Sequence, residues 1–321
     1  MTAQAPVIEG VLPVLQTPFG LDGTIDEATL KGEVDWVLSC GADGVTIAMV
    51  SEVLRLDLNE RKAMAARVCE AADGRGSVVV SIGAESTVVA TRLARHAQSV
   101  GATAVMAIPP LSVRAEGSEL AGYYDAIIEE IEIPVVVQDA SSYVGAGIPV
   151  SVMAEMQARY GDRVYFKPEA QPLGPRLSDL LEATGGEARV FDGSGGIALI
   201  DSFRRGIVGS MPAADVCWAI VTMWRALKSG DLGTAYRVSL PLSAMLAVQT
   251  SLGAYVAVEK YLLRRQGIFV NDLCRGPVDF HVDQLTAVQL DALLGMLEES
   301  CGRAIATRAP TGRQRHSKGD L

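Results

Sequence analysis

The chain has 321 residues, of which 49% are hydrophobic and 21% are charged, and its formal net charge at pH 7 is −10. This length and composition suit one large α/β domain, or a barrel with an appendage, around a well-filled core. The acidic balance argues against nucleic acids and anionic membranes as partners, and no charged-then-apolar leader that would predict a secretory signal is visible at the start.

Eight short apolar runs alternate with helical patterns along the first two thirds of the chain. We expect strands at residues 10–15, 44–48, 77–83, 102–108, 134–138, 164–167, 189–192 and 207–210. We expect helices between them at about 26–40, from 59, 85–100, 118–131, 151–160, 176–184 and from 198. Strands that alternate with helices form a parallel sheet, so eight such units predict a closed (β/α)8 TIM barrel over residues 1–212.

After residue 212 the pattern is helical only, at about 213–229, 231–248, 254–266 and 285–299. We therefore expect a C-terminal helical region over 213–300. The run 238–258 has no charge but contains Pro241, Gln249 and Gly253, which disfavour a membrane span, so we expect it to be buried in a helical layer or a subunit interface. Residues 301–321 are rich in Arg, Gly, Pro and Thr, and this composition predicts a disordered tail.

The cysteines and histidines show no pattern of a disulfide framework or a metal site. Five cysteines are scattered without CxxC spacing, which predicts reduced thiols in a cytoplasmic protein, and the three histidines have no partner spacing for zinc. The chain has no Walker loop, and the glycines around Ser194 do not follow the first strand of a Rossmann unit. We therefore expect neither a metal nor an organic cofactor.

Lys167 closes the apolar run that begins at Val164, just ahead of Pro168. An ammonium group at the end of a buried strand loses part of its hydration, which makes the amine more available as a nucleophile. A lysine at a strand end can instead extend to the surface, and its place in the fold decides between the two. In such barrels the catalytic groups lie on the loops after the strands, and Lys167 falls there.

The other loops at this end of the predicted barrel carry polar groups but no other cation. They hold Thr17, Ser51, Glu52, Gln138, Asp139, Glu169, Gly193, Ser194 and Ser210. An amine among hydroxyls, an amide and backbone donors suits Schiff-base chemistry on a carbonyl substrate. The protonated imine withdraws electrons, so the neighbouring carbon can lose a proton or a carbon–carbon bond can break.

These residues resemble the dihydrodipicolinate synthase/N-acetylneuraminate lyase family of pyruvate-type class I aldolases, over about residues 9–300. The shared features are Pro13 with Thr17-Pro18-Phe19, a loop ending in Ser51-Glu52, Lys167, Gly193-Ser194-Gly195 and Gly209-Ser210. The resemblance implies that Lys167 forms the imine and that backbone amides around Val50 and Ser51 hold the carboxylate of a 2-oxo acid. It also implies a homo-oligomer, which we expect to be a tetramer.

The chain departs from the family at the family's proton relay. Met49-Val50 stands where the family usually has two hydroxyl residues, and Gln138 stands where it has a catalytic tyrosine. Leu111 replaces another tyrosine, and Tyr143 or a near neighbour matches an arginine that grips a second carboxylate in the synthase. The relay that a lysine-biosynthesis enzyme needs is therefore missing.

Gln138-Asp139-Ala140 and Tyr165-Phe166-Lys167-x-Glu169 are most similar to the 2-keto-3-deoxy-L-arabonate dehydratase branch. This similarity implies that Glu169 serves as the acid/base, because a carboxylate two residues from the lysine reaches the same pocket if the turn is tight. Glu169 could instead be a solvated turn residue or pair with Arg176, and Gln138 could be a strand-end amide bonded to backbone. Ser194, Ser210 and Tyr143 complete the expected substrate-binding set, although Ser194 could simply belong to a tight turn.

Three functions remain open from the sequence. The first is cofactor-independent dehydration of a 2-keto-3-deoxy sugar acid through an imine on Lys167. The second is aldol condensation or cleavage with pyruvate through the same imine. The third is a binding or regulatory protein that kept the barrel and lost the relay.

Overall fold

The computed structural model describes residues 6–141 and 145–303. Its strands are β1 (Gly10–Val11), β2 (Gly44–Ile47), β3 (Ser77–Ser81), β4 (Ala104–Ala107), β5 (Val135–Asp139), β6 (Val164–Pro168), β7 (Arg189–Asp192) and β8 (Gly209–Ser210). The helices of the first part are α1 (Glu27–Ser39), α2 (Leu58–Ala72), α3 (Thr87–Ser99), α4 (Gly117–Glu130), α5 (Val150–Tyr160), α6 (Leu173–Ala183) and α7 (Leu199–Arg204). The later helices are α8 (Cys217–Ser229), α9 (Leu232–Leu246), α10 (Leu252–Arg265) and α11 (Gln284–Ser300), and three short 3-10 helices are η1 (Met49–Ser51), η2 (Val53–Arg55) and η3 (Gly161–Arg163).

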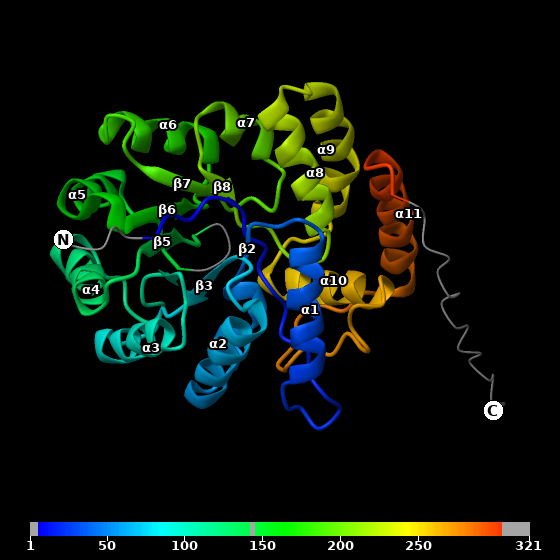
Figure 1. Ribbon diagram of the computed structural model, residues 1–321, viewed down its shortest axis with the longest axis horizontal. Helices are drawn as coiled ribbons and strands as arrows, with labels where there is room; N and C mark the ends of the chain where they lie inside the picture. Colours follow the sequence, from blue (N-terminus) through cyan, green and yellow to red (C-terminus); the bar gives the residue numbers. More distant parts are fainter. Residues whose placement is uncertain (1–5, 142–144, 304–321) are drawn as a thin grey trace, which may run out of the picture.

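The strands form a parallel barrel surrounded by helices, as Figure 1 shows from one end. Their order is β1-β8-β7-β6-β5-β4-β3-β2, so each strand pairs with its neighbours in the chain. The barrel closes beyond the end of β1, where Val14 pairs with Thr46 of β2 in a parallel bridge. The Thr46 amide donates to the Pro13 carbonyl at 2.8 Å, and the Leu15 amide donates to Thr46 at 2.9 Å. The predicted (β/α)8 fold is confirmed.

Side chains alternate between the inside of the barrel and the layer under the helices, as strand geometry requires. Val136, Tyr165 and Phe191 belong to the inner cluster, together with Leu12 and Met106. Their neighbours along the strands pack instead against the helices in the larger outer core. Because the period is two residues, the second residues after Val136, Tyr165 and Phe191 also face the barrel axis, at the C-terminal ends of the strands.

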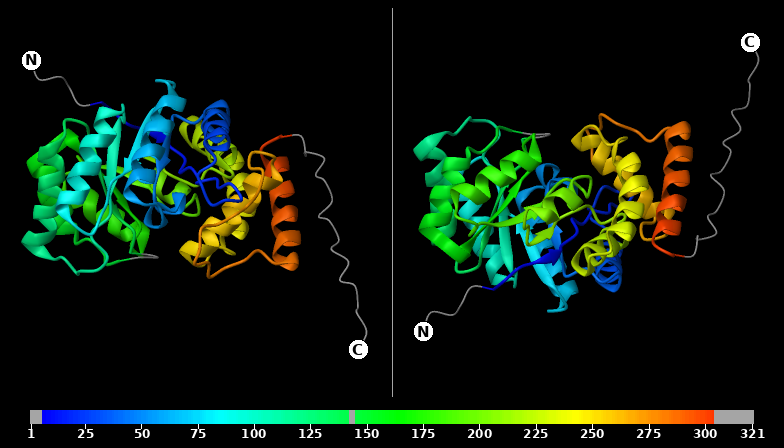
Figure 2. Two further views of the ribbon diagram at one scale, coloured as in Figure 1. Left: turned by 90° about the horizontal axis from the view of Figure 1, so that it is seen from below. Right: turned by 90° about the horizontal axis from the view of Figure 1, so that it is seen from above.

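The C-terminal helices lie together on one side of the barrel (Figure 2). α8 packs on β1 and on α9, and α9 packs on α11. About half of the residues in the uncharged run 238–258 are buried within the chain, with Val238, Leu242 and Val258 fully inaccessible. In the described part of the chain, no helix combines the length and apolar character needed to cross a membrane.

Several boundaries differ from those expected. α8 begins at Cys217 and not near 213, because residues 211–216 form a loop at the barrel mouth. β1 is shorter than the apolar run 10–15, because its later residues pair only through the Val14 bridge. The proposed domain boundary at residue 212 stays a prediction, and residues 304–321 of the expected tail lie outside the described residues.

Candidate active site

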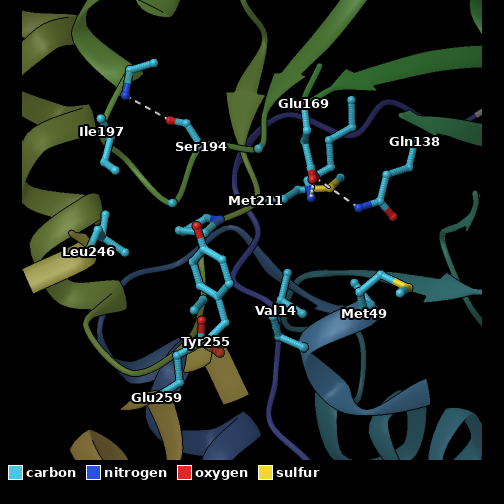
Figure 3. Close-up of a pocket in the computed structure, with 18 of the residues that line it drawn as sticks. Val14, Met49, Gln138, Glu169, Ser194, Ile197, Met211, Leu246, Tyr255 and Glu259 are labelled. Atoms are coloured by element: carbon cyan, nitrogen blue, oxygen red, sulfur yellow. Dashed lines mark hydrogen bonds and ion pairs between the residues drawn. The ribbon is translucent and has the colours of Figure 1, made fainter. Parts of the chain in front are cut away.

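A cavity of about 260 Å³ opens at the C-terminal ends of the strands (Figure 3). Its lining comes from β5, β6, the loops after β2, β7 and β8, and helix α10. The lining residues include Val50, Gln138, Lys167, Glu169, Gly193, Ser194, Asp215, Tyr255 and Glu259. The cavity therefore lies where the sequence predicted the functional end of the barrel.

Lys167 reaches this cavity because of its register on β6. Tyr165 faces the inner core of the barrel, so Lys167, two residues later, faces the same axis at the strand end. Gln138 is its direct partner on β5 and faces inward for the same reason. The Lys167 side chain is only 5% exposed, so the amine is shielded from bulk water and does not extend to the surface.

Glu169 holds both of these side chains. Its Oε1 accepts from Lys167 Nζ and from Gln138 Nε2, the latter at 3.0 Å. Its backbone amide donates to the Asp139 carbonyl at 2.9 Å, which keeps the turn after β6 tight. Its second oxygen, Oε2, is buried without a hydrogen-bond partner. Sequence analysis predicted that Lys167, Glu169 and Gln138 meet, and the structure brings them together.

The alternative readings of these two polar residues are wrong. Glu169 is buried and does not pair with Arg176, whose guanidinium lies 3.5 Å from Asp139 instead. Asp139 also accepts from the Ile148 amide at 2.9 Å, so this carboxylate organises the β5 loop. The amide of Gln138 donates to a side chain, Glu169, and is not merely a strand-end group bonded to backbone.

Gly193 makes room for Glu169. A β-carbon at this position would lie 2.7 Å from both Cγ and Oε1 of Glu169, much closer than real β-carbons approach other atoms. The glycine turn after β7 therefore has a role in the site besides reversing the chain.

Ser194 lines the cavity, but its hydroxyl is bonded within the turn. It donates to Asp192, 2.9 Å from Oδ2, and accepts from the Ala198 amide at 2.9 Å (Figure 3). The Asp192 carboxyl is buried, which raises its pKa, and it also accepts from Ser202 at 2.9 Å. These bonds match the reading of Ser194 as a turn residue.

Val50 lines the cavity as the second residue of η1, whereas Ser51 does not. The Ser51 amide donates to Ala48 at 3.0 Å, and its hydroxyl donates to the Leu15 carbonyl at 2.5 Å. Ser210 is also buried away from the cavity, with its hydroxyl 3.4 Å from the Asp192 carbonyl. The structure thus does not bring Ser51 or Ser210 to the cavity, because both hydroxyls bond to backbone carbonyls instead. Tyr143 lies outside the described residues.

Sequence reasoning missed a second polar wall. Tyr255 and Glu259 reach the cavity from α10, and Asp215 reaches it from the loop after β8. In Figure 3, Tyr255 and Glu259 lie on one side and Glu169 with Gln138 on the other. The sequence does contain one indication of this wall, a single charged residue in an apolar stretch, as with Asp215 between Ala214 and Val216.

Burial dominates the electrostatics of this second wall. It raises the pKa of Asp215 to about 7 and the pKa of Glu259 well above its usual range. Burial also raises the pKa of Tyr255, and the nearby carboxylates Glu259 and Glu169 raise it further. The second wall therefore places carboxyl groups with raised pKa values opposite the lysine.

Lys260 of α10 is another buried lysine, and its side chain is fully inaccessible. Its Nζ pairs with Glu52 and donates to the Leu273 carbonyl at 2.8 Å. It also lies 4.4 Å from the centre of the Phe19 ring. Because Lys260 is tied to Glu52 and does not line the cavity, Lys167 is the amine that lines it.

No group of three or more metal-binding side chains occurs within residues 6–141 and 145–303.

The dihydrodipicolinate synthetase family model matches residues 7–294, nearly the whole chain. The chain belongs to this family. The sequence-based resemblance is therefore confirmed, and the family's members are lyases that act on oxo acids. The role of Lys167 as the imine-forming residue stays a prediction.

Two relatives in the family show how its activities divide. The chain is 29% identical over 307 residues to the L-2-keto-3-deoxyarabonate dehydratase of Azospirillum brasilense, covering 92% of this chain and 97% of the relative. It is 31% identical over 254 residues to a 4-hydroxy-tetrahydrodipicolinate synthase of Thermomicrobium roseum, covering 76% and 82%. These two family members thus carry different reactions at similar identity to this chain.

The fold is also that of solved family structures. The crystal structure of dihydrodipicolinate synthase from Rhodopseudomonas palustris superposes with a TM-score of 0.82 at 25% identity, covering 90% of this chain and 98% of that one.

Proposed function

We propose that the protein dehydrates a 2-keto-3-deoxy sugar acid through an imine on Lys167. The observation that carries this proposal is the buried group of Lys167, Glu169 and Gln138, in which Glu169 Oε2 is left without a partner. A buried carboxylate oxygen without a donor is costly, and a reacting proton or a substrate hydroxyl would satisfy it.

The first step is imine formation. The Lys167 ammonium is hydrogen-bonded to Glu169, so the proton can pass to the carboxylate and leave a neutral amine. The amine adds to the C2 carbonyl of the substrate, and the carbinolamine loses water after Glu169 returns the proton to its oxygen. Val50 lies at the start of η1, where helix amides have no acceptor within the helix, and we assign its amide to the substrate carboxylate.

The second step is elimination. The positive imine acidifies the proton on C3, and Glu169 removes it as the C4 hydroxyl leaves. Gln138 Nε2 bonds to the same Glu169 oxygen as Lys167, so it orients this carboxylate throughout. A single base beside the lysine is enough for this reaction, whereas synthase chemistry needs a longer relay.

Aldol condensation or cleavage is the alternative, because it begins with the same imine. Dehydration is favoured by Gln138 at the position of the family's tyrosine and by the similarity to the Azospirillum brasilense dehydratase along 97% of its length. A binding protein that lost the chemistry is disfavoured, because a degenerate site has no need to keep Lys167 and Glu169 buried and paired.

A panel of five- and six-carbon 2-keto-3-deoxy acids tests the proposal, with products identified by mass spectrometry. We expect loss of one water from at least one acid. We expect no activity in Lys167→Ala and about a 10²-fold or greater loss in Glu169→Gln, the usual effect of removing a general base. Reduction with borohydride in the presence of pyruvate should label Lys167 in the wild type and leave Lys167→Arg unlabelled, because arginine stays protonated. Efficient condensation of pyruvate with aspartate semialdehyde would contradict the dehydratase assignment, and a label on another lysine would contradict the imine.

A further inference from the structure

The cavity wall that faces the lysine is made of acids. Glu259 and Asp215 line it directly, and both are at least 98% buried. Behind them lie Glu33 of α1 and Gln16, which follows β1, and both are fully inaccessible. Three carboxyl groups therefore share one dry region at the edge of the cavity.

This region has too few donors for three carboxylates. Gln16 donates its backbone amide to Glu33 Oε1 at 2.9 Å and its Nε2 to Glu259 Oε2. Two acceptor atoms, Glu33 Oε2 and Gln16 Oε1, are buried with no partner. The neighbouring cation on α10, Lys260, is tied to Glu52 and Leu273.

A proton on the carboxyl groups resolves this shortage. Burial and the charges of Asp215 and Glu33 raise the pKa of Glu259, against the smaller lowering by Gln16. Glu259 is thus a buried carboxyl group with a raised pKa, and it faces the cavity that holds Lys167.

We propose that Glu259 donates its proton to the hydroxyl group that leaves C4 during the elimination. This inference rests on the proposed dehydration. Glu169 takes the C3 proton, the electron pair from that C–H bond forms the C3–C4 double bond, and the C4–O bond breaks. The departing oxygen takes the proton of Glu259 and leaves as water.

The Glu259 carboxylate that remains is stabilised by the N–H of Gln16 Nε2. Glu169 has gained a proton and Glu259 has lost one, so proton exchange with water in the cavity resets both before the next turnover. No oxidant or reductant is needed.

The variant Glu259→Gln tests this role, with Glu298→Gln on α11 as a matched control that removes a buried carboxyl outside the cavity. Glutamine keeps the shape but cannot donate a carboxyl proton. We expect dehydration to fall about 10²–10⁴-fold in Glu259→Gln, the usual size of an acid-catalysis effect, and to stay at the wild-type rate in the control. Borohydride labelling of Lys167 should be unchanged in both.

A substrate with fluoride in place of the C4 hydroxyl distinguishes proton donation by Glu259 from a purely structural role. Fluoride leaves without a proton donor, so Glu259→Gln should eliminate fluoride at nearly the wild-type rate. Wild-type dehydration by Glu259→Gln, or equal losses with both leaving groups, would overturn the role of Glu259 while sparing the dehydratase. A wild type that labels at Lys167 but eliminates neither water nor fluoride would overturn the proposed function, and this inference with it.

Discussion

Asp215 illustrates what burial does to a single side chain in this protein. It lies at the cavity edge at 2% exposure, and burial raises its pKa to about 7 from its ordinary value of 3.8. Between these two values the folded state keeps a proton on Asp215 that the unfolded state has already released. Fewer protons in the unfolded state mean that stability falls as pH rises through this interval.

We therefore predict that Asp215→Asn changes the pH dependence of stability. Across pH 4 to 7, the unfolding free energy of the wild type should fall relative to the variant by as much as about 1.4 kcal/mol per pH unit, the slope for one proton. Urea unfolding at several pH values and one protein concentration measures this difference. The surface carboxyls are the same in both proteins, so they cancel. Parallel stability curves for the two proteins would contradict the prediction.

Among single residues, the sequence predicts the positions of Lys167, Gln138 and Glu169 well and misses Asp215 and Glu259. Lys167, Gln138 and Glu169 lie on adjacent strands or two residues apart, so strand periodicity alone places them together. Glu259 is placed by the packing of α10 across the barrel mouth, and no local pattern encodes that packing. Ser51 and Ser210 were predicted at the site because a hydroxyl on a loop looks the same whether it faces a substrate or bonds backbone.

The glycine turn after β7 is the element whose composition the site explains best. Gly195 and Gly196 have φ of 69° and 108°, so the backbone itself favours glycine there. Gly193 has no such positive φ, and its lack of a side chain leaves room for Glu169.

We predict that Gly193→Ala damages catalysis through Glu169. The added methyl group must displace a carboxylate held by Lys167 and Gln138, so dehydration should fall toward the level of Glu169→Gln, about 10²-fold or more. Borohydride labelling at Lys167 should persist. Gly186→Ala is a control for glycine loss, because a β-carbon there meets nothing within 4 Å, although its φ of 83° adds strain. Full activity in Gly193→Ala would show that Glu169 need not occupy its position in this structure.

Strands and helices could be predicted from the sequence where the pattern of apolar residues was clear. All eight strands were expected from apolar runs, because buried parallel strands are continuous in hydrophobic residues. Residues 213–216 were predicted to be helical, because Ala213, Ala214 and Val216 fit a helix equally well, but they lie in the loop at the barrel mouth.

For the whole molecule, the uncharged run 238–258 argues for assembly less than expected, because about half of its residues are buried within the chain. Leu240, within this run, belongs to an exposed apolar stripe on α9 that does argue for assembly. Leu232, Tyr236 and Leu240 recur every four residues on one face and are 41%, 47% and 71% exposed. Such a stripe of apolar side chains on a helix surface is typical of an interface.

We predict a homo-oligomer, a tetramer at micromolar concentration, with this face of α9 in a subunit contact. Leu240→Glu places a charge at the most exposed residue of the stripe, so the molar mass measured by light scattering should fall below that of the wild type. Val88→Glu on α3 is the matched control, because Val88 is 58% exposed but belongs to a different face of the barrel wall. It should leave the mass unchanged. A monomeric wild type would contradict assembly itself, whereas an unchanged mass in Leu240→Glu would move the interface away from α9.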